Sequence, residues 1–204
     1  MKRIALLGMP NTGKSTLFNR LSGASARVGN WPGITVDLMS AKVLVGGHIA
    51  ELIDLPGLYD LHGFSDDEQV VRHFLSNNAV NLALIVLNST QIDRQLSLAL
   101  QIRSLGLPAV LVLNMQDEAK RAGITIDIVK MAEEINLPVL KLSAKYGDGC
   151  PALLKKSAEV IDQQAEKVSA TDIAKRLEAD NQIDAEMQAI VERSVQIPAT
   201  LNNE

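Results

Sequence analysis

A glycine-rich segment near the N-terminus has the residue types that bind phosphate. Residues 8–15 read GMPNTGKS, which fits the pattern G-x-x-x-x-G-K-[ST]. Glycines let backbone N–H groups turn inward around phosphate oxygens, and a helix that begins at Lys14 adds partial positive charge. The Lys14 ammonium can bridge β- and γ-phosphates, and the Ser15 hydroxyl can ligate Mg²⁺. The segment predicts a nucleoside triphosphate site whose phosphates contact Gly8, Asn11, Thr12, Gly13, Lys14, Ser15 and Thr16.

A second segment predicts the base. Residues 114–117 read NMQD and follow an apolar run that ends at Leu113. Guanine presents N1–H and N2–H₂ side by side, and the Asp117 carboxylate can accept both, whereas adenine would leave that charge without a partner. Unmet polar groups of this kind give discrimination on the order of 10⁴-fold. We therefore predict guanine binding by Asn114, Met115 and Asp117, with Asn114 bracing the loop, and an ATPase is disfavoured.

The segment SAK at residues 143–145 follows the last predicted strand and completes the base site. The N–H of Ala144 can donate to guanine O6, and the stem of Lys120 or Lys145 can cover the base face. Ser143, Ala144 and Lys145 are therefore predicted to bind guanine.

Two further segments are expected to sense the γ-phosphate. In DLPG at residues 54–57, Asp54 ends a strand and can hold Mg²⁺ through water, while the N–H of Gly57 can meet the γ-phosphate. In VGNWPGITVD at residues 28–37, Thr35 is placed to ligate Mg²⁺ in the GTP state, and Gly33 is assigned to the phosphates. Trp31 is the only tryptophan and lies in this Gly/Pro-rich loop, so we expect it outside the core.

Short apolar runs alternate with helical patterns, which predicts the elements that position these residues. Buried strands are expected at residues 3–8, 80–88, 109–114 and 139–143, and helices at 14–22, 66–77, 92–105, 126–135 and 151–167. Residues 36–45 and 48–54 flank Gly46-Gly47, which predicts a hairpin. This order predicts an α/β fold with a mostly parallel sheet, one antiparallel edge strand, and ligands at the carboxyl ends of the strands.

The composition changes after residue 167. Asp180-Asn181-Gln182 is expected to divide the remaining tail into two helices, and the second carries one apolar stripe: Ile183, Met187, Ile190, Val191 and Val195. Such a stripe packs against its own domain, or against another copy, more often than against an outside partner. We predict a GTP-binding domain over residues 1–167 and a short C-terminal helical extension over 168–204.

The overall composition indicates which classes of partner and which cellular compartment suit the chain. The 204 residues include 20 Lys and Arg against 24 Asp and Glu, a formal charge of −4, which argues against nucleic acid as a partner. The single cysteine, Cys150, suits a reducing cytosol. No apolar run reaches the length of about 18 residues that a membrane span needs, so we expect a soluble piece of something larger.

Together these segments resemble the P-loop GTPase (Ras-like) superfamily, and one of its families in particular. The segment at residues 28–37 is similar to switch I of the ferrous-iron transport protein B family, which pairs a G-x-P-N-x-G-K phosphate loop with N-[WY]-P-G-x-T-V. The match includes residues 54–59, DLPGLY, and residues 113–120, LNMQDEAK. The resemblance covers residues 1 to about 165.

The resemblance implies a polytopic membrane transporter with an N-terminal cytosolic GTPase at the cytoplasmic face of the bacterial inner membrane. The implied partners are GTP or GDP, the transmembrane part of the same transporter, and another copy of the chain. The implied ions are Mg²⁺ and K⁺, with K⁺ held by the Asn11 side chain and by backbone oxygens of Gly29 and Trp31. Leu58 occupies the position of the water-orienting glutamine of Ras-like enzymes, so K⁺ would supply the missing positive charge.

The leading interpretation is hydrolysis of GTP to GDP and phosphate, with catalytic roles for Asn11, Lys14, Thr35 and Gly57, coupled to ferrous-iron import. One alternative is a soluble ribosome- or RNA-associated GTPase, which would need a basic RNA-binding domain. Another is a nucleotide sensor with negligible turnover.

Overall fold

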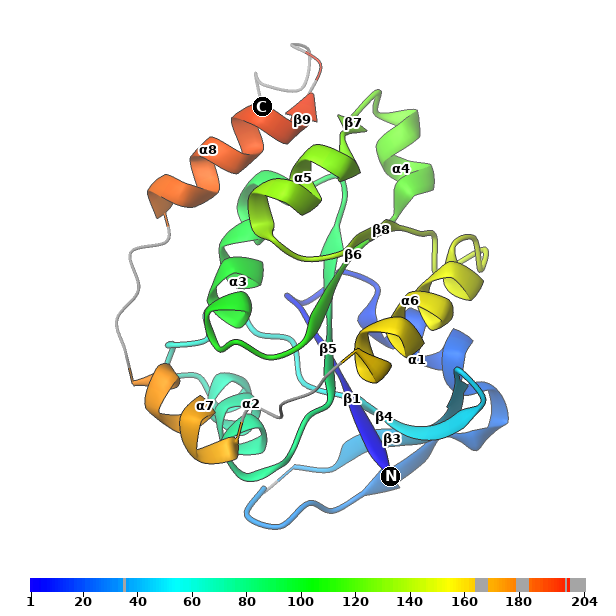
Figure 1. Ribbon diagram of the computed structural model, residues 1–204, viewed down its shortest axis with the longest axis vertical. Helices are drawn as coiled ribbons and strands as arrows, with labels where there is room; N and C mark the ends of the chain where they lie inside the picture. The colour runs from blue at the N-terminus through cyan, green and yellow to red at the C-terminus, as the bar shows by residue number, and fades with distance from the viewer. Residues whose placement is uncertain (35, 164–168, 179–183, 197, 199–204) are drawn as a thin grey trace.

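The computed structural model describes residues 1–34, 36–163, 169–178, 184–196 and 198. A seven-stranded sheet lies between two layers of helices, with strand order β2-β3-β4-β1-β5-β6-β8 (Figure 1). The strands are β1 Lys2–Leu7, β2 Arg27–Gly29, β3 Leu38–Val45, β4 His48–Asp54, β5 Leu82–Asn88, β6 Ala109–Asn114 and β8 Val139–Lys141.

The strand directions confirm the mostly parallel sheet. Strands β4, β1, β5, β6 and β8 run parallel to one another, and β3 pairs antiparallel with β4 across the hairpin at Gly46-Gly47. The short β2, which the sequence analysis did not predict, pairs antiparallel with β3 at the edge. Leu6 of β1 lies beside Asp54 of β4, so the carboxyl ends of these two strands meet at one edge of the sheet.

The helices also follow the prediction, with differences at their ends. They are α1 Lys14–Ser22, α2 Asp66–Asn77, α3 Ile92–Ser104, α4 Gln116–Arg121, α5 Ile128–Ile135, α6 Cys150–Asp162, α7 Ala170–Leu177 and α8 Asp184–Ser194, with a 3₁₀ turn η1 at Gly23–Ser25. Helix α5 begins later than predicted because the Asp127 side chain accepts from the N–H groups of Val129 and Lys130 and caps it. Helix α4 was not predicted, because its six residues are too few to show helical periodicity in the sequence.

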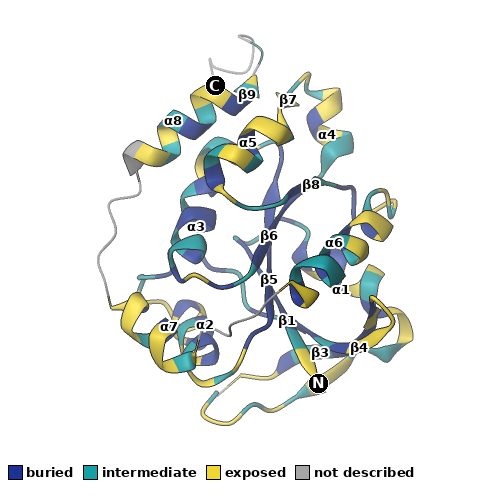
Figure 2. Cartoon of the chain, in the orientation of Figure 1, coloured by how far each residue is buried: buried dark blue, intermediate teal, exposed yellow. Residues whose placement is uncertain are grey.

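The core lies on both faces of the sheet. One apolar cluster joins the sheet to α2, α3, α5, α7 and α8, and the other joins it to α1 and α6. Every residue of β5 and β6 is buried, while the outer faces of the helices are exposed (Figure 2). Burial on both faces explains why these strands read as unbroken apolar runs.

The described part of the C-terminal tail packs on the same domain. Helix α7 contacts α2, and α8 contacts α3 and α5. Ile190 is buried, and Met187, Val191 and Val195 pack against the first cluster, whereas Ile183 and residues 180–182 lie outside the described residues. Strand β9, Val195–Gln196, pairs antiparallel with β7, Thr125–Ile126. The domain boundary at residues 167/168 also lies outside the described ranges and stays a prediction.

Among the helices of the described ranges, none has both the length and the apolar composition needed to cross a bilayer.

Candidate nucleotide-binding site

The predicted phosphate loop lies between the end of β1 and the start of α1. Asn11 and Gly13 adopt left-handed backbone conformations, with φ of 62° and 80°. A Cβ at Gly13 would overlap the amide nitrogen of Asn114, so only glycine fits where the loop meets the base segment. Inside the loop, the Thr12 hydroxyl donates to the carbonyl of Met9 at 3.0 Å. The loop therefore has a fixed shape that side chains from within and behind it support.

Two of the residues predicted to hold Mg²⁺, Ser15 and Asp54, meet at the carboxyl end of the sheet. Ser15 Oγ donates to Asp54 Oδ2 at 2.8 Å, and Lys14 Nζ lies 3.8 Å from Asp54 Oδ1. Burial raises the pKa of the Asp54 carboxyl, and the Lys14 charge and the Ser15 hydrogen bond partly offset that rise. Asp54 Oδ1 is buried and accepts no hydrogen bond. A hydroxyl and a carboxylate with an unused oxygen fit Mg²⁺, which prefers hard oxygen ligands.

Gly57 lies directly against the phosphate loop. A Cβ at this position would come within 2.9 Å of both the backbone nitrogen and Cγ of Pro10. The next residue, Leu58, donates its N–H to the carbonyl of Gly8 at 3.2 Å. Gly57 therefore occupies the place from which its N–H can sense a γ-phosphate, and any larger residue there would displace the loop.

Of the switch residues that the structure describes, Trp31 and Gly33 lie against α2. Trp31 packs edge-on against Phe74 of α2, with ring centroids 5.0 Å apart, and the Arg3 guanidinium lies 5.4 Å from its ring centre. Gly33 is in close contact with His73 of the same helix. Gly33, Ile34 and Val36 line one cavity together with Asp66, Gln69 and His73 of α2, so these residues of the segment between β2 and β3 lie beside that helix.

Trp31 is not one of the buried core residues, in agreement with the expectation that it lies outside the core, but its ring does not extend into solvent either. It is partly buried against the first apolar cluster, because a large aromatic side chain is stabilised when it leaves water. Gly29, the other backbone K⁺ ligand that the resemblance implies, belongs to β2. Thr35 lies outside the described residues. The structure thus brings Lys14, Ser15 and Asp54 together. The ligand roles of all the predicted site residues, including Gly29, Trp31, Gly33 and Thr35, stay predictions.

Asn114 joins the phosphate loop to the base segments. It ends β6 and is only 2 % exposed. Its amide Nδ2 donates to the carbonyl of Thr12 at 2.8 Å, and its Oδ1 accepts from the N–H of Ala144 at 2.9 Å. One side chain therefore connects three segments that are far apart in the sequence, as a bracing role for Asn114 requires.

Asp117 lies on the first turn of α4 with its carboxylate held in the ionised form. Ser143 Oγ donates to Oδ1 at 2.7 Å, and the Arg121 guanidinium contacts Oδ2 at 3.1 Å. The Ser143 hydrogen bond is the main cause that lowers the pKa of Asp117, and the charges of Arg121 and Lys145 act in the same direction. An ionised carboxylate is the acceptor that two guanine donors require.

The lysines predicted to cover the base lie at the surface. Lys145 is exposed, and its ammonium lies 5.3 Å from the ring centre of Tyr146. Lys120 is exposed too and lines an open cavity beside Asp117 and Ser143. Both stems are therefore free to move toward a base.

Two residues that the sequence analysis did not single out contact this part of the site. Arg121 is one helical turn beyond Asp117, and the i, i+4 spacing of opposite charges was its signal in the sequence. Ser89 lies behind the loop and donates to the carbonyl of Asn114. No sequence pattern distinguishes a single serine after a buried strand.

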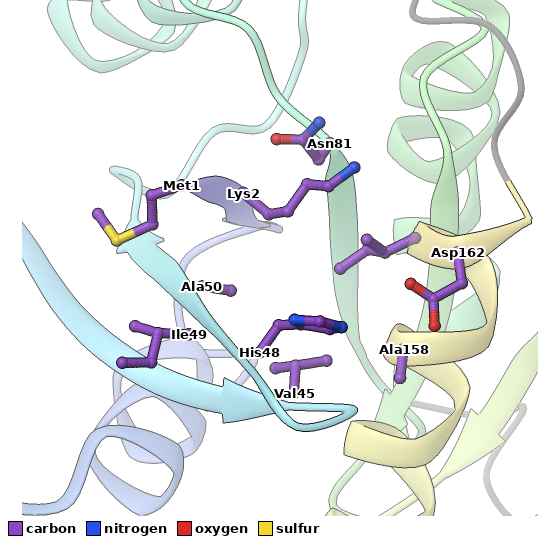
Figure 3. A pocket seen from close by; sticks show the side chains of 10 residues that line it. Met1, Lys2, Val45, His48, Ile49, Ala50, Asn81, Ala158 and Asp162 are labelled. Carbon is purple, nitrogen blue, oxygen red and sulfur yellow. The ribbon is translucent and has the colours of Figure 1, made fainter.

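A separate cavity of about 440 Å³ lies at the opposite end of the sheet, where β1 begins. Lys2, His48, Asn81 and Asp162 supply its polar lining, between the β3–β4 hairpin and the end of α6 (Figure 3). These side chains come from separate elements, and the phosphate loop lies at the other end of β1. The cavity is therefore distinct from the predicted nucleotide site.

Replacing Ser143 by alanine is expected to raise the pKa of Asp117 toward its ordinary value of 3.8, because the hydrogen bond that favours the carboxylate is lost. In the unsubstituted protein the charge, and the stability linked to it, is present above pH 3.8 and is lost as the pH falls through the lowered pKa. In Ser143→Ala that loss occurs at higher pH. The carboxyl ¹³C shift of Asp117 followed against pH measures both midpoints, and identical midpoints would contradict the assignment.

Comparison with known proteins agrees with this geometry. The family model described as "Ferrous iron transport protein B" matches residues 2–157. The Fe(2+) transporter FeoB of Synechocystis sp. is 46% identical over 198 residues, which is 97% of this chain and 32% of that protein. The Campylobacter jejuni protein of the same name is 42% identical over 154 residues, 76% of this chain and 25% of that protein. The chain thus spans about a third or less of the length of these relatives.

Solved structures agree with the predicted fold. The cytosolic domain of L. pneumophila FeoB superposes with a TM-score of 0.80 at 27% identity, covering 96% of this chain and 100% of that one. The GDP-bound A143S mutant of the S. thermophilus FeoB G-domain gives a TM-score of 0.76 at 27% identity, covering 95% of this chain and 88% of that one. The P-loop GTPase fold is therefore confirmed, and the chain belongs to the ferrous iron transport protein B family.

Proposed function

We propose that this chain is the GTP-binding and GTP-hydrolysing cytosolic domain of a bacterial ferrous-iron transporter. It would act at the cytoplasmic face of the inner membrane, where its nucleotide state controls Fe(II) uptake by the transmembrane part of the same protein. The observation that carries the proposal is the continuous site from Lys14, Ser15 and Asp54 through Asn114 to Asp117. Further copies of the chain are proposed as partners around the transporter, and nucleic acid is not.

The fixed residues bind and orient the nucleotide. The Lys14 ammonium contacts the β- and γ-phosphates, and the Asp117 carboxylate accepts from guanine N1–H and N2–H₂. Ser15 and Asp54 would hold Mg²⁺, which screens phosphate charge when bound, and Asn11 would hold K⁺, which adds a second positive charge. In hydrolysis, a water oxygen bonds to the γ-phosphorus, the bond to the β–γ bridging oxygen breaks, and the water proton passes to the released phosphate or solvent.

The switch segment, residues 28–37, would supply the remaining ligands of the phosphates and of Mg²⁺. Gly33 would contact phosphate and Thr35 would ligate Mg²⁺. A movement of Gly33 from His73 toward the phosphates would compete with the packing of Trp31 on Phe74. Gly57 already lies on the phosphate loop, and its N–H would bind the γ-phosphate. Leu58 carries no group that can orient water, so the backbone of residues 33–35 is assigned that task.

The potassium proposal predicts faster GTP hydrolysis in KCl than in NaCl, by at least about tenfold. An arginine finger, which supplies positive charge in the same role, is worth about 10³–10⁵ in rate. Asn11→Ala is expected to lose the difference between the salts while it keeps GDP binding, because its backbone and the Lys14 contact remain. Phosphate release measured at matched ionic strength tests this. Equal rates in both salts would reject K⁺, and no turnover in either would favour the sensor alternative.

A further inference from the structure

Ser89, directly after β5, is a buried serine whose hydroxyl uses both its donor and its acceptor capacity. It is 0 % exposed. Its Oγ donates to the carbonyl of Asn114 at 2.6 Å, and its backbone N–H donates to the same carbonyl at 3.0 Å. The same Oγ accepts from Nε2 of Gln116 at 2.6 Å. Ser89 therefore holds the residues on both sides of Met115.

Met115 is the strained point of this loop. Its φ of 60° and ψ of 37° place it in the left-handed region, which a residue with a Cβ adopts only when its surroundings enforce it. Before it, the Asn114 carbonyl receives two hydrogen bonds from Ser89. After it, Gln116 donates its side-chain amide to Ser89 and its backbone N–H to the carbonyl of Leu142 at 3.2 Å. These bonds hold the peptide groups on either side of the strained residue.

The direction of the Asp117 carboxylate depends on this turn. Helix α4 begins at Gln116, directly after Met115, and Asp117 is its second residue. A change in the Met115 conformation would rotate the first turn of α4 and move the carboxylate away from Ser143. We propose that Ser89 is a positioning residue for guanine specificity, acting through Asn114 and Gln116 without touching the base. The inference rests on the proposed function and deepens it.

Ser89→Ala is the direct test, and Ser157→Ala is its matched control. Ser157 in α6 is also buried, at 1 % exposure, and its Oγ donates to the carbonyl of Leu153 at 2.7 Å, so the same atoms are removed from a comparable environment away from the site. Ser89→Ala removes two side-chain hydrogen bonds, the one donated to the Asn114 carbonyl and the one accepted from the Gln116 amide, and leaves that amide without its partner. We expect the Kd for GDP to rise about tenfold, while Ser157→Ala keeps the original value.

A second readout separates positioning from general loss of stability. Inosine diphosphate lacks the exocyclic amino group, so the ratio of its Kd to that of GDP reports how well Asp117 meets both guanine donors. Ser89→Ala should lower this ratio by several-fold, and Ser157→Ala should leave it unchanged even if both variants lose thermal stability equally.

The outcomes are distinct. A Ser89→Ala protein with the GDP affinity and the ratio of the Ser157→Ala control would overturn the inference, whereas an unsubstituted protein that binds no GDP would refute the proposed function instead. If Ser89→Ala does not fold, Gln116→Leu removes the amide that Ser89 accepts and is expected to lower the same ratio. An unchanged ratio in Gln116→Leu would then reject the role of Ser89.

Discussion

The variant Asp117→Asn is expected to bind GDP roughly 10³–10⁴-fold more weakly than the unsubstituted chain and to gain affinity for xanthosine diphosphate. The carboxylate accepts from both guanine donors, whereas an amide offers one acceptor and one donor. Xanthine carries a carbonyl where guanine carries the amino group, so the amide matches it. Ser143 still donates to the amide oxygen, which keeps the side chain in place.

Calorimetric titration of both diphosphates into both proteins measures this exchange of specificity. Asp162→Asn is the matched control, since Asp162 lines the separate cavity at the far end of the sheet. It should bind GDP as the original chain does. If Asp117→Asn kept its preference for GDP over the xanthine nucleotide, Asp117 would not be the base-reading residue.

Lys14→Met is expected to weaken GTP binding by roughly 10²–10³-fold, because truncating a charged partner at a buried contact costs about 2–5 kcal/mol. Methionine keeps most of the length of the lysine stem, so packing at the start of α1 is largely preserved. The Lys14 side chain is mostly buried, at 10 % exposure, and faces Asp54. Water therefore screens the Lys14 charge little, and loss of this charge should strongly weaken the binding of a nucleoside triphosphate.

Lys42→Met, at an exposed position of β3, is the control for Lys14→Met, and it should leave GTP affinity unchanged. Fluorescent GTP-analogue binding measures both variants. Under the proposed function, Lys14→Met in the parent transporter should also abolish nucleotide-dependent uptake of radioactive Fe(II). GTP affinity within threefold of the original in Lys14→Met would show that this residue does not bind the phosphates.

The sequence predicted the parts of the site whose signals are local. The phosphate loop follows from one short pattern between a strand and a helix, and the sheet follows from apolar runs that lie on buried strands. Asp117 could be proposed as a guanine ligand because N-x-x-D directly follows one of those strands. The structure places its carboxylate beside Ser143, and guanine binding by both residues stays a prediction.

The parts that were missed depend on contacts between distant segments. Trp31 packs on Phe74 and Arg3, which belong to α2 and β1, and no local pattern records that packing. The pairing of β7 with β9 and the hydrogen bond from Ser89 to Asn114 join segments in the same way. Composition indicated a loop near phosphates for Trp31, and tertiary burial of its ring determined where it lies.

The central claim is that one site recognises both the phosphates and the guanine base of a nucleotide. Calorimetry of this chain with GDP, a non-hydrolysable GTP analogue and ATP, each with Mg²⁺, tests it most directly. The account predicts saturable uptake of the two guanine nucleotides with Kd well below about 1 mM and no detectable uptake of ATP. No heat of binding from either guanine nucleotide at millimolar concentration, or equal affinity for ATP, would contradict it.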